Sequence, residues 1–184
     1  MKITIAGGHG TIARHLTRLL AAEGHHVRSL VRKQDQFVDI EAVGGQPVLV
    51  DLEDTTADQL ADAVGDVDAV VFAAGSGPGS GAARKESVDH LGAVALIEAA
   101  KRHDVAHYVM VSSMGANADH DGDEVFDAYL RAKGQADDAL RSVSYTHLTL
   151  PTIYSVSISV VAVSFKKNNN MLCRYRQELD EHHS

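Results

Sequence analysis

The segment that most constrains the fold is KITIAGGHGTIARHLTRLL, residues Lys2–Leu20. An alternating apolar run comes first, three glycines in four positions follow, and an apolar helical period comes last. Alternation at every second residue is typical of a strand, and apolar residues three to four apart are typical of a helix. Since glycine has no Cβ, it permits a tight turn and the close approach of other atoms. The segment therefore predicts a strand, a tight loop and a helix in succession.

Strand-like and helix-like runs continue to alternate as far as residue 142. The predicted strands are Ile3–Ala6, Val27–Val31, Pro47–Val50, Ala69–Ala73 and Tyr108–Ser112. The predicted helices are Thr11–Ala22, Asp35–Val43, Thr56–Val64, Val88–His103 and Asp123–Arg141. Repeated strand–helix units with right-handed crossovers predict an α/β fold, a doubly wound parallel sheet of the Rossmann type with strand order 3-2-1-4-5. Such sheets bind ligands at the carboxyl edge, where the strand order reverses.

The chain has 184 residues, which suits one compact domain. Composition changes abruptly after Ser142, where serine recurs at nearly every second position and an asparagine run follows. The segment SYTHLTLPTI resembles a translated sequencing adapter. We therefore expect a Rossmann domain over residues 1–142 and an atypical tail over 143–184 that is not native sequence. The alternative is an extra strand or hairpin, Ser155–Phe165, at the edge of the sheet.

The formal charge of −8 at pH 7 argues against a nucleic-acid surface, because phosphate binding draws on clustered Lys and Arg. No run approaches the roughly 20 apolar residues that cross a bilayer. A strand-like run follows Met1 almost at once, so no targeting segment is expected there and the expected compartment is the cytoplasm. We expect a small-molecule substrate and neither nucleic acid nor membrane as partner. The sequence leaves the oligomeric state open.

Histidines and acidic residues raise the question of a metal site. His103 and His107 have the i, i+4 spacing of helical ligand pairs, but the run between them is predicted to leave a helix for a strand. The acidic run 119–124 resembles a calcium loop. However, its glycine falls two places early, and Leu130 stands where the bidentate Glu is needed. The sequence therefore predicts no metal site.

The glycine-rich loop has the pattern GxxGxxA at the entrance to the first predicted helix. Backbone N–H groups in such a loop, with the positive potential of the helix N-terminus, suit a pyrophosphate. A bare turn is the alternative, but strand, loop, helix and position in a βαβ unit agree, which favours dinucleotide binding. The predicted cofactor-binding residues of the loop are Gly7, Gly8, His9, Gly10, Thr11, Ile12 and Ala13.

The end of the second predicted strand indicates which dinucleotide binds. NAD-preferring folds place Asp or Glu about 20 residues after the glycines, whereas Arg accommodates the 2′-phosphate of NADP. Here the strand ends in Arg32 and Lys33, with no carboxylate. A guanidinium meets phosphate in a bidentate geometry, and Lys33 would add a second cation. We therefore expect NADP(H) in preference to NAD(H), although both side chains could also simply face solvent.

Several motifs occur in a familiar order: GGHGTIA, VRSLVRK, VDLED, FAAGSG, VMVSS and YLRAK. Together they resemble an atypical short-chain dehydrogenase/reductase, of the small bacterial NAD(P)H-binding subgroup related to the epimerase/dehydratase branch. The resemblance covers residues 1–142. It implies that Asp51 and Leu52 flank the adenine and that Ala73, Ala74 and Gly75 run under the ribose. The alternative for Asp51 is that it begins a turn with the acidic residues after it.

Tyr129 and Lys133 lie four residues apart, and therefore on one face of a predicted helix. An ammonium near a phenol favours its ionised form, so this tyrosine could donate a proton to a carbonyl oxygen as hydride arrives. The pair could also be ordinary surface residues. The resemblance implies that Lys133 also holds the nicotinamide ribose and that Ser112 or Ser113 orients the substrate; which serine does so stays open.

These features predict an NAD(P)H-dependent oxidoreductase that transfers hydride to a small carbonyl, quinone or flavin-like substrate. The rival hypothesis is a non-catalytic module that binds NADP(H) and reports the redox state to a partner. Relatives of the resembled group continue with a strand and a segment that covers the substrate. In this chain YTHLTLP stands at that place, so the sequence does not identify the substrate.

Overall fold

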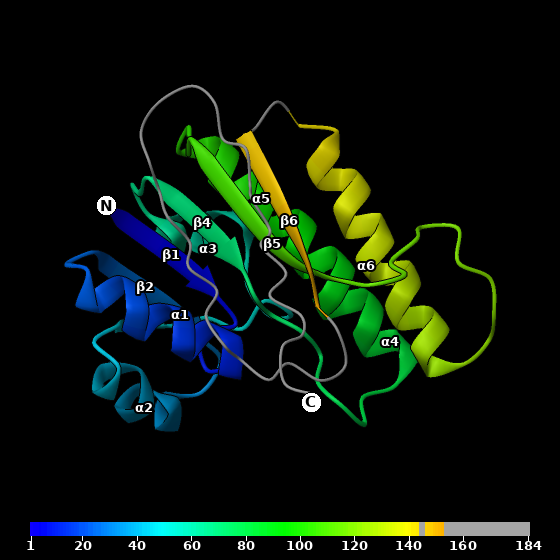
Figure 1. The fold of residues 1–184 in the computed structure, drawn as a ribbon, viewed down its shortest axis with the longest axis horizontal. Coiled ribbons are helices and arrows are strands. Elements are labelled where there is room, and N and C mark those ends of the chain that lie inside the picture. The colour runs from blue at the N-terminus through cyan, green and yellow to red at the C-terminus, as the bar shows by residue number, and fades with distance from the viewer. Residues whose placement is uncertain (144–145, 153–184) are drawn as a thin grey trace, which may run out of the picture. The chain divides into compact units, whose positions relative to one another are not determined.

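The computed structural model describes residues 1–143 and 146–152. Six strands form one parallel sheet in the order β3-β2-β1-β4-β5-β6 (Figure 1). Their bounds are β1 Lys2–Ala6, β2 His26–Val31, β3 Gln46–Leu49, β4 Ala69–Phe72, β5 His107–Ser113 and β6 Thr146–Thr152. The predicted doubly wound sheet with the order 3-2-1-4-5 is confirmed. The strand order reverses between β1 and β4, at the point where such sheets bind ligands.

Strand β6 extends the sheet beyond the five predicted strands. It pairs with β5 from His107 opposite Thr146 to Ser113 opposite Thr152. The regular alternation of the sequence stops at residue 142, but backbone pairing requires only an extended segment beside an open strand edge. The alternative hairpin at Ser155–Phe165 lies outside the described residues.

Helices connect the strands. Their bounds are α1 Thr11–Ala22, α2 Phe37–Ala42, α3 Ala57–Val64, α4 Ala82–Arg84, α5 Gly92–Arg102 and α6 Val125–Arg141, with a 3₁₀ turn η1 at Gln34–Gln36 and a π-helix η2 at Lys85–Leu91. The predicted helix Val88–His103 was too short at its start, since helical structure begins at Ala82. The polar run before Val88 carries no apolar period, and burial of Lys85 supports the helical turn there instead.

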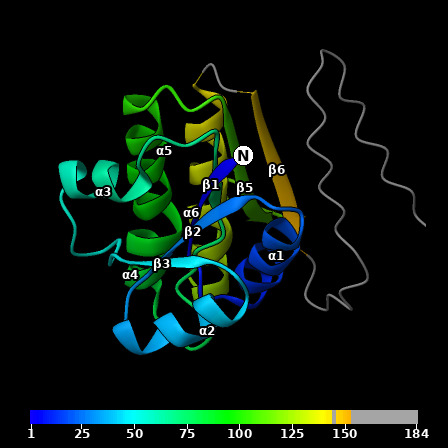
Figure 2. The same cartoon turned by 90° about the vertical axis from the view of Figure 1, so that its left-hand side faces the viewer.

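The helices cover the two faces of the sheet. Figure 2 shows α3, α5 and α6 on one face and α1 on the other. The larger core lies under α3, α5 and α6, where Leu60, Leu96 and Leu140 pack with Phe72 and Met110 of the strands. On the face of α1, the residues Ile3, Ile5 and Ala13 are fully buried. Burial of these apolar side chains on both faces fixes the carboxyl ends of β1 to β5 relative to one another.

Three observations concern the expectations about membranes and metals. Within residues 1–143 and 146–152, no helix is both long and apolar enough to cross a bilayer. His103 follows the end of α5 and His107 opens β5, so the two do not share a helical face. In the same described ranges, no group of three or more His, Cys, Asp or Glu side chains is arranged to hold a metal ion.

Candidate functional site

The glycine loop between β1 and α1 packs directly against the end of β4. Gly7 has φ = 77°, and a Cβ at this position would lie 2.5 Å from the Cα of Ala74. A Cβ on Gly8 would similarly lie 2.6 Å from the Cβ of Ser29 in β2. These close approaches explain why glycine occupies both positions, since no other residue has the required space.

Helix α1 begins without a side-chain cap. Gly10 is its N-cap residue, no acidic residue occurs in the first turn, and the hydrogen bond from Arg14 N–H to the Gly10 carbonyl spans 2.9 Å. The N–H groups of Thr11, Ile12 and Ala13 precede this bond, so they have no intrahelical acceptor. Together with the helix dipole they form a site that suits a phosphate oxygen.

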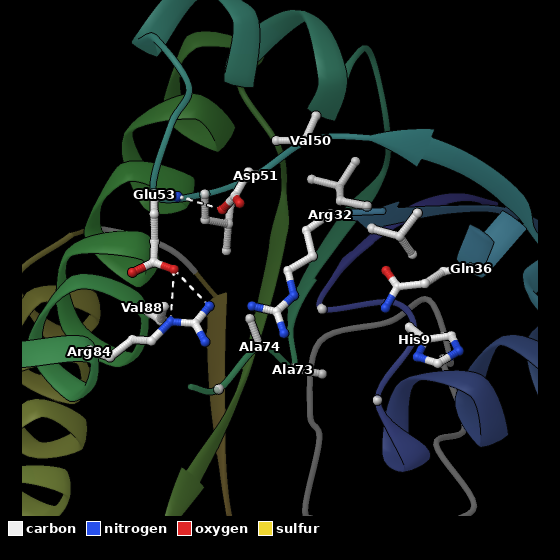
Figure 3. Close-up of a pocket in the computed structure, with 16 residues that line it drawn as sticks. His9, Arg32, Gln36, Val50, Asp51, Glu53, Ala73, Ala74, Arg84 and Val88 are labelled. Atoms are coloured by element: carbon white, nitrogen blue, oxygen red, sulfur yellow. Dashed lines mark hydrogen bonds and ion pairs between the residues drawn. The ribbon is translucent and has the colours of Figure 1, made fainter. Parts of the chain in front are cut away.

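A cavity of about 280 Å³ opens at the carboxyl ends of β1, β2, β3 and β4 (Figure 3). Many of the predicted cofactor-binding residues line it: Gly7, His9, Gly10, Arg32, Asp51, Leu52, Ala73, Ala74 and Gly75. The remaining predicted residues, Gly8, Thr11, Ile12, Ala13 and Lys33, are not among the lining residues. The first four of these belong to the loop and helix start beside the cavity. Lys33 is exposed and caps the 3₁₀ turn η1.

Asp51 begins the turn that the sequence analysis gave as the alternative to a place beside the adenine. Its Oδ1 accepts a hydrogen bond from the Glu53 N–H at 3.0 Å, and its carbonyl accepts from the Asp54 N–H at 3.1 Å. This is the turn that the acidic residues predicted. Asp51 nevertheless lines the cavity, at the end of β3.

An ion pair that no sequence pattern indicated lies at the rim of the cavity. Arg84 donates from Nε and Nη2 to Oε2 of Glu53, at 3.0 and 2.8 Å, and both residues line the cavity. Ser87 donates to the other oxygen of Glu53 at 2.6 Å. These hydrogen bonds, that of Arg84 first, lower the pKa of the Glu53 carboxyl. No local signal in the sequence points to Arg84, because it reaches the cavity from a different strand–helix unit than Arg32.

Lys133 lies buried beside the same edge of the sheet. Its Nζ is 3.2 Å from Oδ1 of Asp89, and it donates to the carbonyls of Ala74 and Val111 at 3.4 Å each. Asp89 Oδ2 also accepts from the N–H of Ser76 at 3.1 Å. Burial lowers the pKa of the Lys133 ammonium, while the Asp89 carboxylate acts in the opposite direction. One buried ion pair thus connects α6, η2 and the chain that leaves β4.

Tyr129 is half-buried and lies between two lysines. The Lys85 Nζ is 5.3 Å from the centroid of its ring and the Lys133 Nζ is 5.9 Å from it. Phe126 stacks on the ring with a centroid separation of 5.9 Å. Lys85 is buried and donates to the Gly77 carbonyl at 3.0 Å. Tyr129 therefore lies beside two lysine side chains, of which Lys133 is paired with Asp89.

The two serines at the end of β5 have different surroundings. Ser112 is buried and donates to Oδ2 of Asp137 at 2.7 Å. Ser113 is half-buried, and its Oγ donates to the Met114 carbonyl at 3.3 Å. Neither serine lines the cavity described above, and neither do Tyr129 and Lys133. The two groups of residues meet at Ala74, which lines the cavity and accepts from Lys133.

Comparisons with known proteins agree with this geometry. The model of a family described as NAD(P)H-binding matches residues 7–163. An uncharacterized sugar epimerase of Bacillus subtilis, YhfK, is 34% identical over 148 residues, which are 80% of this chain and 69% of that protein. The chain spans about half the length of two matching yeast proteins.

Solved structures share the fold. A protein of Bacillus halodurans, provisionally described as an NAD-dependent epimerase/dehydratase, superposes with a TM-score of 0.74 at 34% identity, over 82% of this chain and 69% of its own. WbmH of Bordetella bronchiseptica, solved with NAD+, superposes with a TM-score of 0.66 at 21% identity, over 82% of this chain and 55% of its own. The glycine loop, the sheet topology and these matches together show that the chain belongs to the NAD(P)H-binding family and is similar to the atypical short-chain dehydrogenases/reductases.

Proposed function

We propose that the chain is an NADP(H)-dependent oxidoreductase that reduces a small carbonyl, quinone or flavin-like substrate. The observation that carries the proposal is the position of Lys133. Its ammonium contacts the Ala74 carbonyl, at the wall of the coenzyme cavity, and lies near the ring of Tyr129. A single buried cation thus links the residues expected to hold the coenzyme with the residue expected to donate a proton.

The residues around the cavity fit a nicotinamide dinucleotide. A Cβ on Gly7 would collide with Ala74, so glycine lets the loop lie directly against the wall of the cavity, beside the N–H groups of the first turn of α1. Arg32 points into the cavity from the end of β2 in Figure 3, and none of the ion pairs within the described residues involves its guanidinium. A guanidinium in this position suits the 2′-phosphate, which supports NADP(H) over NAD(H).

The chain's own residues would then carry the proton chemistry. Bound NADPH would supply a hydride. Tyr129 would donate its phenolic proton to the substrate oxygen, and the ammonium groups of Lys133 and Lys85 would stabilise the phenolate that remains. Ser113 is the better candidate to orient the substrate oxygen, because the hydroxyl of Ser112 is buried against Asp137. Asp89 would hold Lys133 in position.

The test is to measure the reductase activity and the NADPH affinity of the variant Tyr129→Phe. We expect loss of reductase activity by at least a hundredfold with NADPH affinity nearly unchanged, because the change removes only a proton donor. Tyr108→Phe, which removes the hydroxyl group of a tyrosine buried in the core, is the matched control and should keep its activity. Loss of NADPH binding in Tyr129→Phe would contradict the placement of this residue.

The substrate panel should separate the rival functions. Small carbonyl compounds, quinones, flavins and sugars are each incubated with the protein and NADPH. Steady NADPH consumption supports the oxidoreductase. Binding of NADPH without turnover of any compound would favour the redox-sensing module instead. Isomerisation of a sugar without net coenzyme consumption would favour an epimerase, the activity in the name of the Bacillus subtilis relative.

A further inference from the structure

Two guanidinium groups face each other across the coenzyme cavity. Arg32 enters from the end of β2, and Arg84 enters from the end of α4 on the opposite side (Figure 3). Lys33, the second cation expected from the sequence, is exposed and is not among the residues that line the cavity. The structure therefore brings a second basic residue, Arg84, to the cavity in place of Lys33.

Arg84 is held in position by the loop that follows β3. Glu53 accepts from its Nε and Nη2 through a single oxygen, and Ser87 occupies the other oxygen of Glu53. A guanidinium has five N–H donors, and these contacts use two of them. The remaining donors are available to a further acceptor in the cavity. Because Glu53 fixes the side chain beforehand, little conformational entropy is lost when such an acceptor binds.

The N–H donors at this end of the cavity suit a phosphate group. Arg84 and Arg32 supply two positive charges, and the carboxylates of Glu53 and Asp51, which also line the cavity, offset them. The side chain of Asp51 is turned onto the Glu53 N–H, where it caps a turn. An anion located between the two guanidinium groups would interact favourably with both of them, and charge-assisted hydrogen bonds of this kind are the strong ones.

We propose that Arg84, and not Lys33, is the second cation that recognises the 2′-phosphate of NADP(H), with Glu53 as the residue that positions it. This inference rests on the proposed NADP(H) preference. Its alternative is that Arg84 and Glu53 form only a structural contact between α4 and the loop after β3. The two possibilities differ in one measurable respect. Loss of a phosphate contact weakens NADPH alone, whereas loss of a structural contact weakens both coenzymes.

The experiment is fluorescence titration of NADPH and NADH on the full chain and on five variants, one of which is Arg32→Met. Arg84→Met should lower the preference for NADPH over NADH by about tenfold, the usual effect of one charge-assisted contact. Arg84→Lys keeps the positive charge but lacks the planar N–H donors of the guanidinium. It should show a preference for NADPH between that of the unaltered protein and that of Arg84→Met. Lys33→Met should change the preference by less than about twofold. Arg102→Met removes an exposed arginine that pairs with Asp58 outside the cavity, and it should change neither affinity.

Each outcome decides the inference. Equal weakening of both coenzymes by Arg84→Met, an unchanged preference, or an equal loss of preference in Lys33→Met would each overturn it. If the unaltered protein prefers NADPH and Arg32→Met abolishes that preference while Arg84→Met does not, this inference fails and the proposed function stands. If the unaltered protein binds both coenzymes equally, the NADP(H) preference and the role of Arg84 fail together.

Discussion

The Nζ of Lys133 and the Oδ1 of Asp89 lie 3.2 Å apart, with only 4% and 0% of the two side chains exposed. Lys133 comes from α6 and Asp89 from η2, so the pair joins two helices beneath the carboxyl edge of the sheet. Taking both charges out of water is costly, and each is tolerated because the other is present. The pair also borders Tyr129 and the chain after β4, which gives it a place in the candidate active site.

Replacing one partner of this pair should destabilise the fold. Asp89→Asn leaves the Lys133 ammonium buried without its counter-charge, and we expect a loss of about 3 kcal/mol in the free energy of unfolding. Urea denaturation measures this change in the free energy of unfolding. Asp58→Asn removes a carboxylate from an exposed ion pair with Arg102 and should cost less than about 1 kcal/mol. Similar losses in both variants would contradict the burial argument.

The glycine loop allows a test that separates backbone strain from a steric collision. Gly7→Ala requires an unfavourable φ and also places a methyl group against Ala74, so we expect at least a tenfold loss of NADPH affinity. Gly24→Ala is the matched control, because Gly24 has φ = 81° but no atom within 4 Å of its Cβ position. It should cost about 1 kcal/mol of stability and leave the affinity unchanged. Isothermal titration calorimetry measures the affinity, and equal affinity losses in both variants would exclude the collision.

Asp137 should make stability fall as pH rises. Burial raises the pKa of its carboxyl above the ordinary 3.8, while the Ser112 hydroxyl and the charges of Arg141 and Lys133 act in the opposite direction and Asp138 adds to the rise. The folded state therefore holds this proton at a pH where the unfolded chain has released it. The contribution of the protonated Asp137 carboxyl to the stability of the fold is complete below about pH 4, and it is lost as pH increases through the raised pKa.

The variant Asp137→Asn checks this dependence. Its free energy of unfolding should improve relative to that of the unaltered protein between pH 4 and pH 8, as followed by denaturation at several pH values. Asp58→Asn, in an exposed pair with Arg102, is the control and should parallel the unaltered protein. A constant difference between Asp137→Asn and the unaltered protein over the whole range would mean that Asp137 does not titrate differently in the two states.

Replacing Gly134, the one glycine of α6, should destabilise the fold. A Cβ there would collide with the backbone of Asn117 and Ala118, so the loop after β5 packs directly onto the helix. Gly134→Ala should lower the free energy of unfolding by about 1–3 kcal/mol, the usual range for overpacking. Gly92→Ala in α5 meets only ordinary contacts at 3.5 Å and should stabilise the fold by up to about 1 kcal/mol. Thermal denaturation compares them, and stabilisation by Gly134→Ala would show that the loop moves away freely.

The sequence by itself determined the order of the elements and the position of the glycine loop. The limits of α1 agree with the prediction, and Gly7 and Gly10 border the cavity at the reversal of the sheet. These features are local. Apolar periodicity, the lack of a Cβ and right-handed crossovers act between neighbours in the chain, so they can be recognised without coordinates.

Only the tertiary structure decided which charged side chains meet. It placed Arg84 opposite Arg32, left Lys33 outside the cavity, buried Asp89 against Lys133 and distinguished Ser112 from Ser113. It also added β6 to the edge of β5. Each of these contacts joins segments that are distant in the chain. Pairing of charges and strand edges depends on distance in space and on burial, which residue types and their local spacing do not specify.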